Sequence, residues 1–365
     1  MQKKTIIKIA SALLALLLVI TAIGCGKDET VMTYSGKTIT RGEFEYYLAT
    51  YKAKFDQIFK DYENTAEFYS TAIDESGMTA EKYLFSLALE NIKLTLVSDA
   101  LFTEYGLVLP DEAESEIDDY IADIIDDYAD GDKKVMNKAL SNYGIDISAL
   151  REIYLRDERV SILFDYLYGD VGVNVITEDD KNAYAEETYS HIIHIYVNNK
   201  FKYAADSDGF AILDTNGLPK KNGVTPEESA VKEELISAID ASLSEGGDFY
   251  EIYDAFSEDK QYKNGYYLTR STDFIPEVVS VSFKIEVGEV VKIESDYGTH
   301  YIKRISLGAS PWKDSANSDF FSSFDGDLQQ HMFAEFVKQN TADVTVDESI
   351  INQYSIEKSP SNYLF

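Results

Sequence analysis

Two short stretches bracket the part of the chain that decides its fold. The first is Tyr189–Ile195 (YSHIIHI) and the second is Asp296–Lys303 (DYGTHYIK). Both are rich in β-branched and aromatic residues, alternate in character and have turn residues close by, a pattern typical of β-strands. The sequence therefore predicts two strands that carry histidines.

Three shorter segments lie between these strands: Gly246–Tyr250 (GGDFY), Phe256–Asp259 (FSED) and Phe283–Val290 (FKIEVGEV). Taken in order, the five pieces resemble the parvulin family of peptidyl-prolyl isomerases. That family has a Ser-His-Ile-Leu strand, a helix ending in Gly-x-x-Phe, a Phe-Ser-x-Asp step, a Leu-x-x-Gly-Glu-Val turn and a closing Gly-x-His-x-Ile-Lys strand. Each piece alone is weak, but the ordered set spans about a third of the chain and is a strong signal.

The whole chain resembles lipid-anchored extracellular foldases of the PrsA and SurA family, in which a parvulin domain is inserted in a helical chaperone domain. The resemblance implies an α+β protein whose helical domain is formed by the N- and C-terminal segments. It predicts a four-stranded, mostly antiparallel sheet flanked by helices. The expected divisions are a signal peptide at 1–24, a helical chaperone domain at 25–184, a parvulin-like domain at 185–306, and a segment at 307–365 that packs back on the N-terminal domain.

Composition is consistent with a folded, strongly acidic protein of two or three domains. The 365 residues are 45% hydrophobic, enough for a sizeable core, and include 27 Tyr and 19 Phe. These rings either belong to the core or line grooves for unfolded peptide. The formal net charge is −32. Such a surface repels phosphate groups, so nucleic-acid binding is not expected.

Cysteine and histidine usage argues against a disulfide and against a metal site. The single cysteine, Cys25, excludes an intramolecular disulfide, and the four histidines show no clustered metal spacing. His191 and His194 are an odd number of residues apart on one predicted strand, so they point to opposite faces and cannot share a ligand. No metal and no organic cofactor is expected.

The N-terminus predicts export and anchoring. Three lysines, the last of them Lys8, precede an apolar run at Ile9–Ile23, which is typical of a secretion signal and short for a membrane span. The following Cys25 resembles the lipidated residue of a lipoprotein. We therefore expect an extracytoplasmic protein held to the cell membrane by lipid on Cys25. The alternative is a simple signal peptide with an incidental cysteine.

Helical signals dominate the rest of the chain. Thr40 and Glu43 form a capping-box pattern before an apolar stripe, and further helices are expected at about 79–105, from 111, at 148–168 and at 320–340. A purely structural bundle explains these helices as well as a chaperone does. The binding of unfolded clients is implied only by the resemblance.

The resemblance also implies the site. His191 and His300 would be paired histidines at the centre of the sheet, hydrogen-bonded side by side. Asp259 would set the polarity at the twisting amide, and the proline-binding residues would be Phe274, Val278 and Phe283. The alternatives are a histidine pair that only orders the sheet, and plain core positions for the three apolar residues.

Two positions depart from the parvulin pattern. Leu268 stands where the family has a glycine, and the segment before His300 is one residue short, which leaves Ser295 as the candidate hydroxyl. The first hypothesis is a membrane-anchored peptidyl-prolyl isomerase and foldase acting on newly secreted proteins with X-Pro bonds. The second is an inactive parvulin-like holdase, which Leu268 favours. A solute-binding lipoprotein is disfavoured because no βαβ alternation appears. A monomer and a homodimer both fit.

Overall fold

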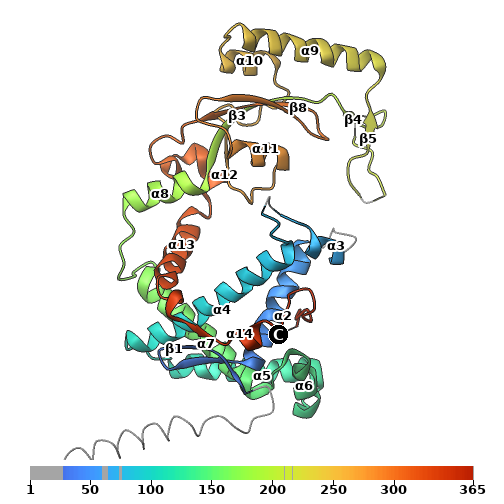
Figure 1. Ribbon diagram of the computed structural model, residues 1–365. Helices are drawn as coiled ribbons and strands as arrows, with labels where there is room; N and C mark the ends of the chain where they lie inside the picture. The colour runs from blue at the N-terminus through green and yellow to red at the C-terminus, as the bar shows by residue number, and fades with distance from the viewer. Residues whose placement is uncertain (1–27, 60–64, 74–75, 209, 216, 365) are drawn as a thin grey trace, which may run out of the picture. The chain divides into compact units, whose positions relative to one another are not determined.

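The computed structural model describes residues 28–59, 65–73, 76–208, 210–215 and 217–364, so the expected signal peptide and Cys25 lie outside the described residues. The chain divides into two compact units (Figure 1). One contains the described residues up to Val175 and those from Gln329 onward, and the other is Ile176–Leu328. Helical and antiparallel β elements make up both units, which confirms the predicted α+β class.

The first unit is mainly helical. Its elements are β1 (Thr30–Tyr34), β2 (Lys37–Thr40), α2 (Arg41–Ile58), α3 (Thr65–Ser70), α4 (Ala80–Glu104), α5 (Asp111–Ala129), α6 (Lys133–Leu140), α7 (Ile147–Tyr168), β9 (Thr345–Val346) and α14 (Glu348–Ile351). Helix α13 (Phe324–Lys338) runs across the boundary between the units. In the part of the chain that is described, no helix combines the length and apolarity needed to cross a membrane.

Local sequence signals set the helix starts of this unit. Thr40 and Glu43 form the expected capping box at the start of α2, with the Thr40 backbone N–H donating to Glu43 Oε2 over 2.7 Å. The Thr79 hydroxyl accepts from Lys82 N at the start of α4. These helices bury their apolar stripes in one core that includes Phe44, Ile92 and Leu150.

The C-terminal segment completes the core of the first unit. Strand β9 pairs antiparallel with β1, placing Val346 opposite Met32, so the three-stranded sheet has the order β2-β1-β9. Ile350 and Ile351 of α14 are buried in the same apolar cluster as the N-terminal helices. The two ends of the described chain therefore stabilise one folded unit together.

A buried ionic cluster joins three helices of this unit. Arg156 of α7 donates to Glu43 of α2 over 2.8 Å and to Asp99 of α4 over 3.4 Å. Arg159 donates to the same Asp99 over 2.5 Å. Because removing one member would leave a buried charge unpaired, this cluster fixes how α2, α4 and α7 pack.

The second unit is built on an antiparallel sheet. Its elements are α8 (Glu178–Thr188), β3 (Ser190–Val197), β4 (Phe201–Tyr203), β5 (Lys221–Gly223), α9 (Pro226–Ser244), α10 (Phe249–Phe256), β6 (Tyr266–Leu268), α11 (Pro276–Ser282), β7 (Val290–Glu294), β8 (Thr299–Ile305) and α12 (Ser318–Phe321). The strand order is β6-β3-β8-β7, and each neighbouring pair is antiparallel, in agreement with the prediction.

Helices cover both faces of this sheet. On one face Ile193 and Tyr301 pack against α9 and α10, which lie together in Figure 1. On the other face Ile192 and Ile302 pack against α11. Because side chains alternate along a strand, this division determines which face each histidine of β3 occupies.

Candidate active site

The candidate site lies on the α11 face of the sheet, where β3 and β8 run side by side. The register places His194 opposite Ile302 and Tyr196 opposite His300. Side chains two residues apart on a strand share a face, so His194, Tyr196 and His300 all point to the side of Ile302. Two adjacent strands therefore bring two histidines together from positions 106 residues apart.

A continuous chain of hydrogen bonds connects these histidines to three other side chains. His194 Nε2 lies 2.9 Å from His300 Nδ1, and His194 Nδ1 lies 3.1 Å from Asp259 Oδ2. Tyr266 donates its hydroxyl to the same Asp259 oxygen over 2.6 Å. At the other end, Ser295 Oγ lies 2.7 Å from His300 Nε2.

The carboxylate of Asp259 determines the direction of this chain. An ionised carboxylate only accepts, so His194 donates through Nδ1 and is left with a lone pair on Nε2. His300 then donates through Nδ1, and its Nε2 accepts the hydroxyl proton of Ser295. Every polar atom between Ser295 and Asp259 is satisfied when both imidazoles are neutral.

Burial and neighbouring groups shift the pKa values of His300, Asp259 and Tyr266, and these shifts favour a neutral His300 and an ionised Asp259. Burial, followed by the proximity of His194, lowers the pKa of His300 to about 4, so the imidazole is neutral near pH 7. Burial raises the pKa of Asp259, but hydrogen bonds from His194 and Tyr266 outweigh this and hold the pKa below its ordinary value. Burial, together with the hydrogen bond to Asp259, raises the pKa of Tyr266. The site therefore contains one anion, Asp259, and a neutral imidazole on His300.

Aromatic rings surround the histidine pair. The Tyr196 ring is parallel to that of His300 within 15°, with centroids 5.2 Å apart. The rings of Phe274 and His194 are nearly perpendicular, at 78°, with centroids 5.6 Å apart, and the centroid of Phe274 also lies 5.0 Å from that of Tyr266. Because His194 and His300 are only 2% and 0% exposed, their hydrogen bonds act in a largely dry environment.

A cavity of about 390 Å³ opens beside Phe274. Phe274 and Phe283, two of the three residues expected to bind proline, both line it. Val278 does not: it is fully buried in the core between α11 and the sheet. The Arg270 guanidinium lies 4.3 Å from the centroid of Phe283 at the same cavity. Ser271, Thr272 and Ser280 also line it, so the recess combines two aromatic rings with hydroxyl groups and one cation.

The expected hydrogen bond between His191 and His300 is wrong, because His300 bonds His194 instead. His191 is three residues from His194 on β3 and points to the opposite face. Its Nδ1 lies 2.8 Å from the Ser306 carbonyl oxygen, and its Nε2 lies 2.9 Å from that of Asn264. The ring stacks on Tyr267 at a centroid distance of 3.9 Å. His191 thus ties the end of the sheet to two loops, away from Asp259.

Sequence reasoning missed His194 and Tyr266 and identified three other members of the hydrogen-bond chain. His300 and Asp259 lie in it, and Ser295 is the hydroxyl beside His300. A usable signal for His194 was present in the stretch itself. Like His191, His194 is followed by an aliphatic residue, Ile195. Only the pairing of β3 with β8 shows which of the two histidines meets His300.

Leu268 does not occupy the site. It lies on β6 opposite Ser190 and is fully buried in the core with Val278. The backbone position that requires glycine is Gly265, with φ of +99°. A Cβ there would lie 2.4 Å from the Ile192 carbonyl oxygen, so this turn brings β6 against β3 only with glycine.

Within the described residues, no three His, Cys, Asp or Glu side chains gather as they would around a metal ion. The described side chains of the site offer a hydrogen-bond chain, one carboxylate and a recess lined by Phe274 and Phe283.

No family model and no curated protein matches the chain. Among solved structures, it is similar to PrsA from Bacillus subtilis, with 14% identity over 87% of this chain and 93% of that chain and a TM-score of 0.23. A peptidylprolyl isomerase (PrsA) from Bacillus cereus matches at 15% identity over 89% and 96%, with a TM-score of 0.27. SurA-like chaperones of Campylobacter jejuni match at 11% over 87% and 98%, with a TM-score of 0.24. At such identities and TM-scores the function has to be judged from the chain's own residues.

Proposed function

We propose that this protein is a peptidyl-prolyl cis/trans isomerase and foldase that acts on newly secreted proteins. The observation that carries the proposal is the hydrogen-bonded set of Asp259, His194 and His300, which Phe274 connects to a cavity lined by Phe274 and Phe283. The ordered sequence pattern that resembles parvulins supports the same reading. The isomerase reaction needs both parts: a recess for the proline ring and a fixed polar group at the amide.

The reaction breaks no covalent bond, so the site has to favour the twisted amide over the planar one. The barrier of about 18–20 kcal/mol comes from conjugation, which places negative charge on the carbonyl oxygen of the planar form. Twisting removes this charge. A fixed carboxylate and a dry surrounding both disfavour the planar form relative to the twisted one.

The hydrogen-bond chain supplies the fixed carboxylate. In the proposed mechanism the proline ring enters the cavity beside Phe283, and the preceding carbonyl faces Asp259. His194 and Tyr266 hold one Asp259 oxygen from two directions. His300 and Ser295 hold His194 in the tautomer that donates to Asp259. The histidines are therefore positioning residues, and no proton is transferred to the substrate.

Catalysed exchange of a short X-Pro peptide, measured with the full chain, tests this proposal. Asp259→Asn keeps the shape and removes the charge, and we expect a loss of about tenfold or more in exchange rate. Asp254→Asn is the matched control, because Asp254 is an exposed residue of α10 whose carboxylate pairs with Lys263 at the surface. A folded wild-type chain without exchange activity would contradict the isomerase proposal.

A holdase without isomerase activity is the second candidate. The observation that favours it is that none of Asp259, His194 and His300 lines the cavity beside Phe274. Leu268 no longer bears on the choice, because it is buried in the core with Val278. If the folded wild-type chain fails to catalyse exchange but still suppresses aggregation of an unfolded test protein, the holdase is the correct reading. Both functions require unfolded client proteins as partners, and homodimers of the chain are compatible with each.

We further propose that the protein acts outside the cytoplasm, anchored by lipid on Cys25. The basic and apolar pattern of residues 1–24 supports this proposal, since it is typical of an export signal. We expect Cys25→Ser to move the protein from the membrane fraction to the soluble fraction. Unchanged membrane association of that variant would contradict the lipid anchor.

A further inference from the structure

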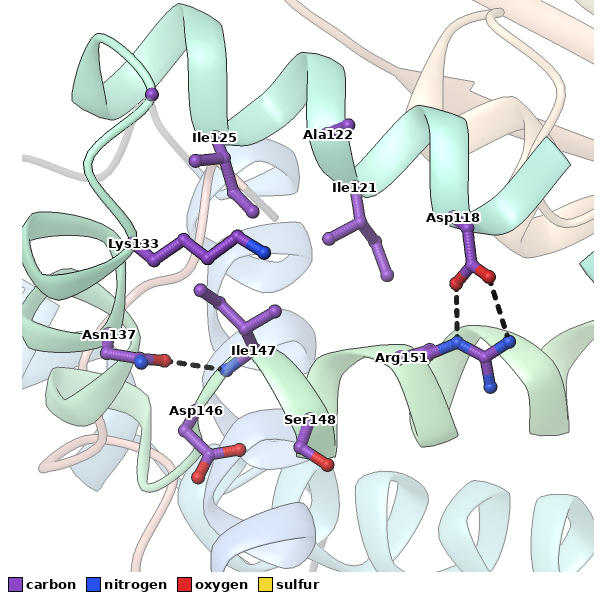
Figure 2. A pocket seen from close by; sticks show the side chains of 11 residues that line it. Asp118, Ile121, Ala122, Ile125, Lys133, Asn137, Asp146, Ile147, Ser148 and Arg151 are labelled. Carbon is purple, nitrogen blue, oxygen red and sulfur yellow. Dashed lines mark hydrogen bonds and ion pairs between the residues drawn. The ribbon is translucent and has the colours of Figure 1, made fainter. Parts of the chain in front are cut away.

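The first unit contains an open groove that the proposed isomerase reaction does not use. It is bounded by α5, α6 and the first turn of α7 and has a volume of about 680 Å³. Ile121 and Ile125 of α5 face Ile147 of α7 across it (Figure 2). Cavities of this size hold ligands of several apolar groups, so the groove is large enough for more than one side chain.

The two cations at this groove are in different situations. Arg151 already forms ion pairs with two carboxylates. Its Nε and Nη2 donate to Asp118 over 2.5 and 3.1 Å, and Nη2 also lies 3.3 Å from Glu114. Lys133 makes no ion pair within the described part of the chain. Its side chain extends over the space between Ile125 and Ile147 (Figure 2). The groove therefore has an apolar floor and an unpaired ammonium group above it.

The polar groups at the opposite side are largely engaged with the backbone of α7. Asp146 caps this helix by accepting from Ala149 N over 2.9 Å. Asn137 Oδ1 accepts from Ile147 N over 2.8 Å. Asp146 and Asn137 thus cap the start of α7, and Lys133 is the cation of the groove that makes no ion pair among the described residues. The chain as a whole has a net charge of −32 and repels acidic segments, so an unpaired lysine at the groove favours the binding of an acidic residue there.

We propose that this groove binds a client segment in which an aliphatic or aromatic residue is next to an acidic one. The apolar side chain would lie between Ile121, Ile125 and Ile147, and the carboxylate would pair with Lys133. The inference rests on the proposed function, since it assumes that the chain binds unfolded proteins. It adds a binding site and a sequence preference independent of proline.

Two labelled peptides and four variants of the full chain test the groove. One peptide has adjacent Leu and Glu residues, and its twin has Gln in place of Glu. We expect Lys133→Gln to raise the Kd of the Glu peptide about threefold or more and to leave that of the Gln twin unchanged. Lys133→Arg should retain the preference. Lys134→Gln, an exposed neighbour outside the groove, should change neither.

Ala122→Phe tests the apolar floor. Ala122 is exposed and lines the groove, so a larger side chain there fills the space without entering the core. We expect it to weaken both peptides about tenfold, with prolyl exchange unchanged because the site of exchange lies in the other unit. Equal binding by Lys133→Gln and Lys134→Gln, or unchanged binding by Ala122→Phe, would overturn the groove proposal.

The measurements also separate this proposal from the proposed function. Prolyl exchange by a wild-type chain that binds neither peptide would refute the groove and leave the isomerase intact. Peptide binding with the expected preference, in a chain without exchange activity, would refute the isomerase and retain the groove.

Discussion

His194 Nε2 lies 2.9 Å from His300 Nδ1, although the register of β3 and β8 pairs His300 with Tyr196. The two histidines are diagonal neighbours on one face of the sheet, and His194 passes the interaction on to Asp259. His191, on the same strand, contacts only the opposite side of the sheet and its loops. This relationship separates a histidine of the candidate site from a structural one.

The two histidines of β3 should respond differently to substitution. We expect His194→Asn to lower kcat/KM for prolyl exchange about tenfold or more, because Asp259 loses the group that orients it. His191→Asn should leave kcat/KM within about twofold and lower the free energy of unfolding by about 1–2 kcal/mol, since a backbone carbonyl loses its donor. Exchange kinetics and urea unfolding of both variants are the measurements. The reverse pattern would place His191 in the site.

Stability should fall on mild acidification because of His300. Burial lowers its pKa from 6.5 to about 4 in the folded protein, so the unfolded chain binds the proton more readily between these values. The contribution of His300 to the free energy of unfolding is fully present above pH 6.5. It decreases as the pH falls toward 4, by at most about 1.4 kcal/mol per pH unit. Urea unfolding at several pH values in this window should show a shallower dependence for His300→Gln. Parallel curves would contradict the assignment.

Substitutions of Phe283 and Val278 should have different effects, because Phe283 lines the cavity and Val278 is buried in the core. Phe283→Ala removes part of the cavity wall, so we expect a higher KM with a smaller change in kcat. Val278→Ala should leave KM unchanged and lower the free energy of unfolding by about 2 kcal/mol, because a fully buried side chain loses two methyl groups. Steady-state exchange kinetics and thermal unfolding distinguish them. An increase in KM for Val278→Ala alone would reverse the assignment.

Two glycines of the second unit provide a matched pair. Gly265 and Gly288 both have positive φ, at +99° and +93°, but only Gly265 lacks room for a Cβ. We expect Gly288→Ala to cost about 1 kcal/mol for the backbone conformation. Gly265→Ala should cost several kcal/mol, since the added carbon would meet the Ile192 carbonyl oxygen at 2.4 Å. Equal destabilisation in urea unfolding would show that the close approach to β3 is unimportant.

Much of the architecture could be predicted from local sequence signals. The capping box of Thr40 and Glu43 and the strand pattern of Thr299–Ile305 depend on residues close in sequence, and the structure contains both elements. The predicted single helix at 320–340 is wrong in one respect, because it is divided into α12 and α13 around Ser322 and Ser323. Adjacent serines favour turns and helix ends over a helix interior, which explains the break.

The site was only partly accessible from sequence, and the limit is physical. The alternation of a strand established that His191 and His194 occupy opposite faces, and the resemblance to parvulins pointed to Asp259, Ser295 and His300. Which face meets His300 depends on the pairing register of strands far apart in the chain. Likewise, whether Phe283 lines a cavity while Val278 enters the core depends on how α11 packs on the sheet. Only the tertiary structure decides which histidine meets His300 and which apolar residues line the cavity, because both depend on contacts between segments far apart in the sequence.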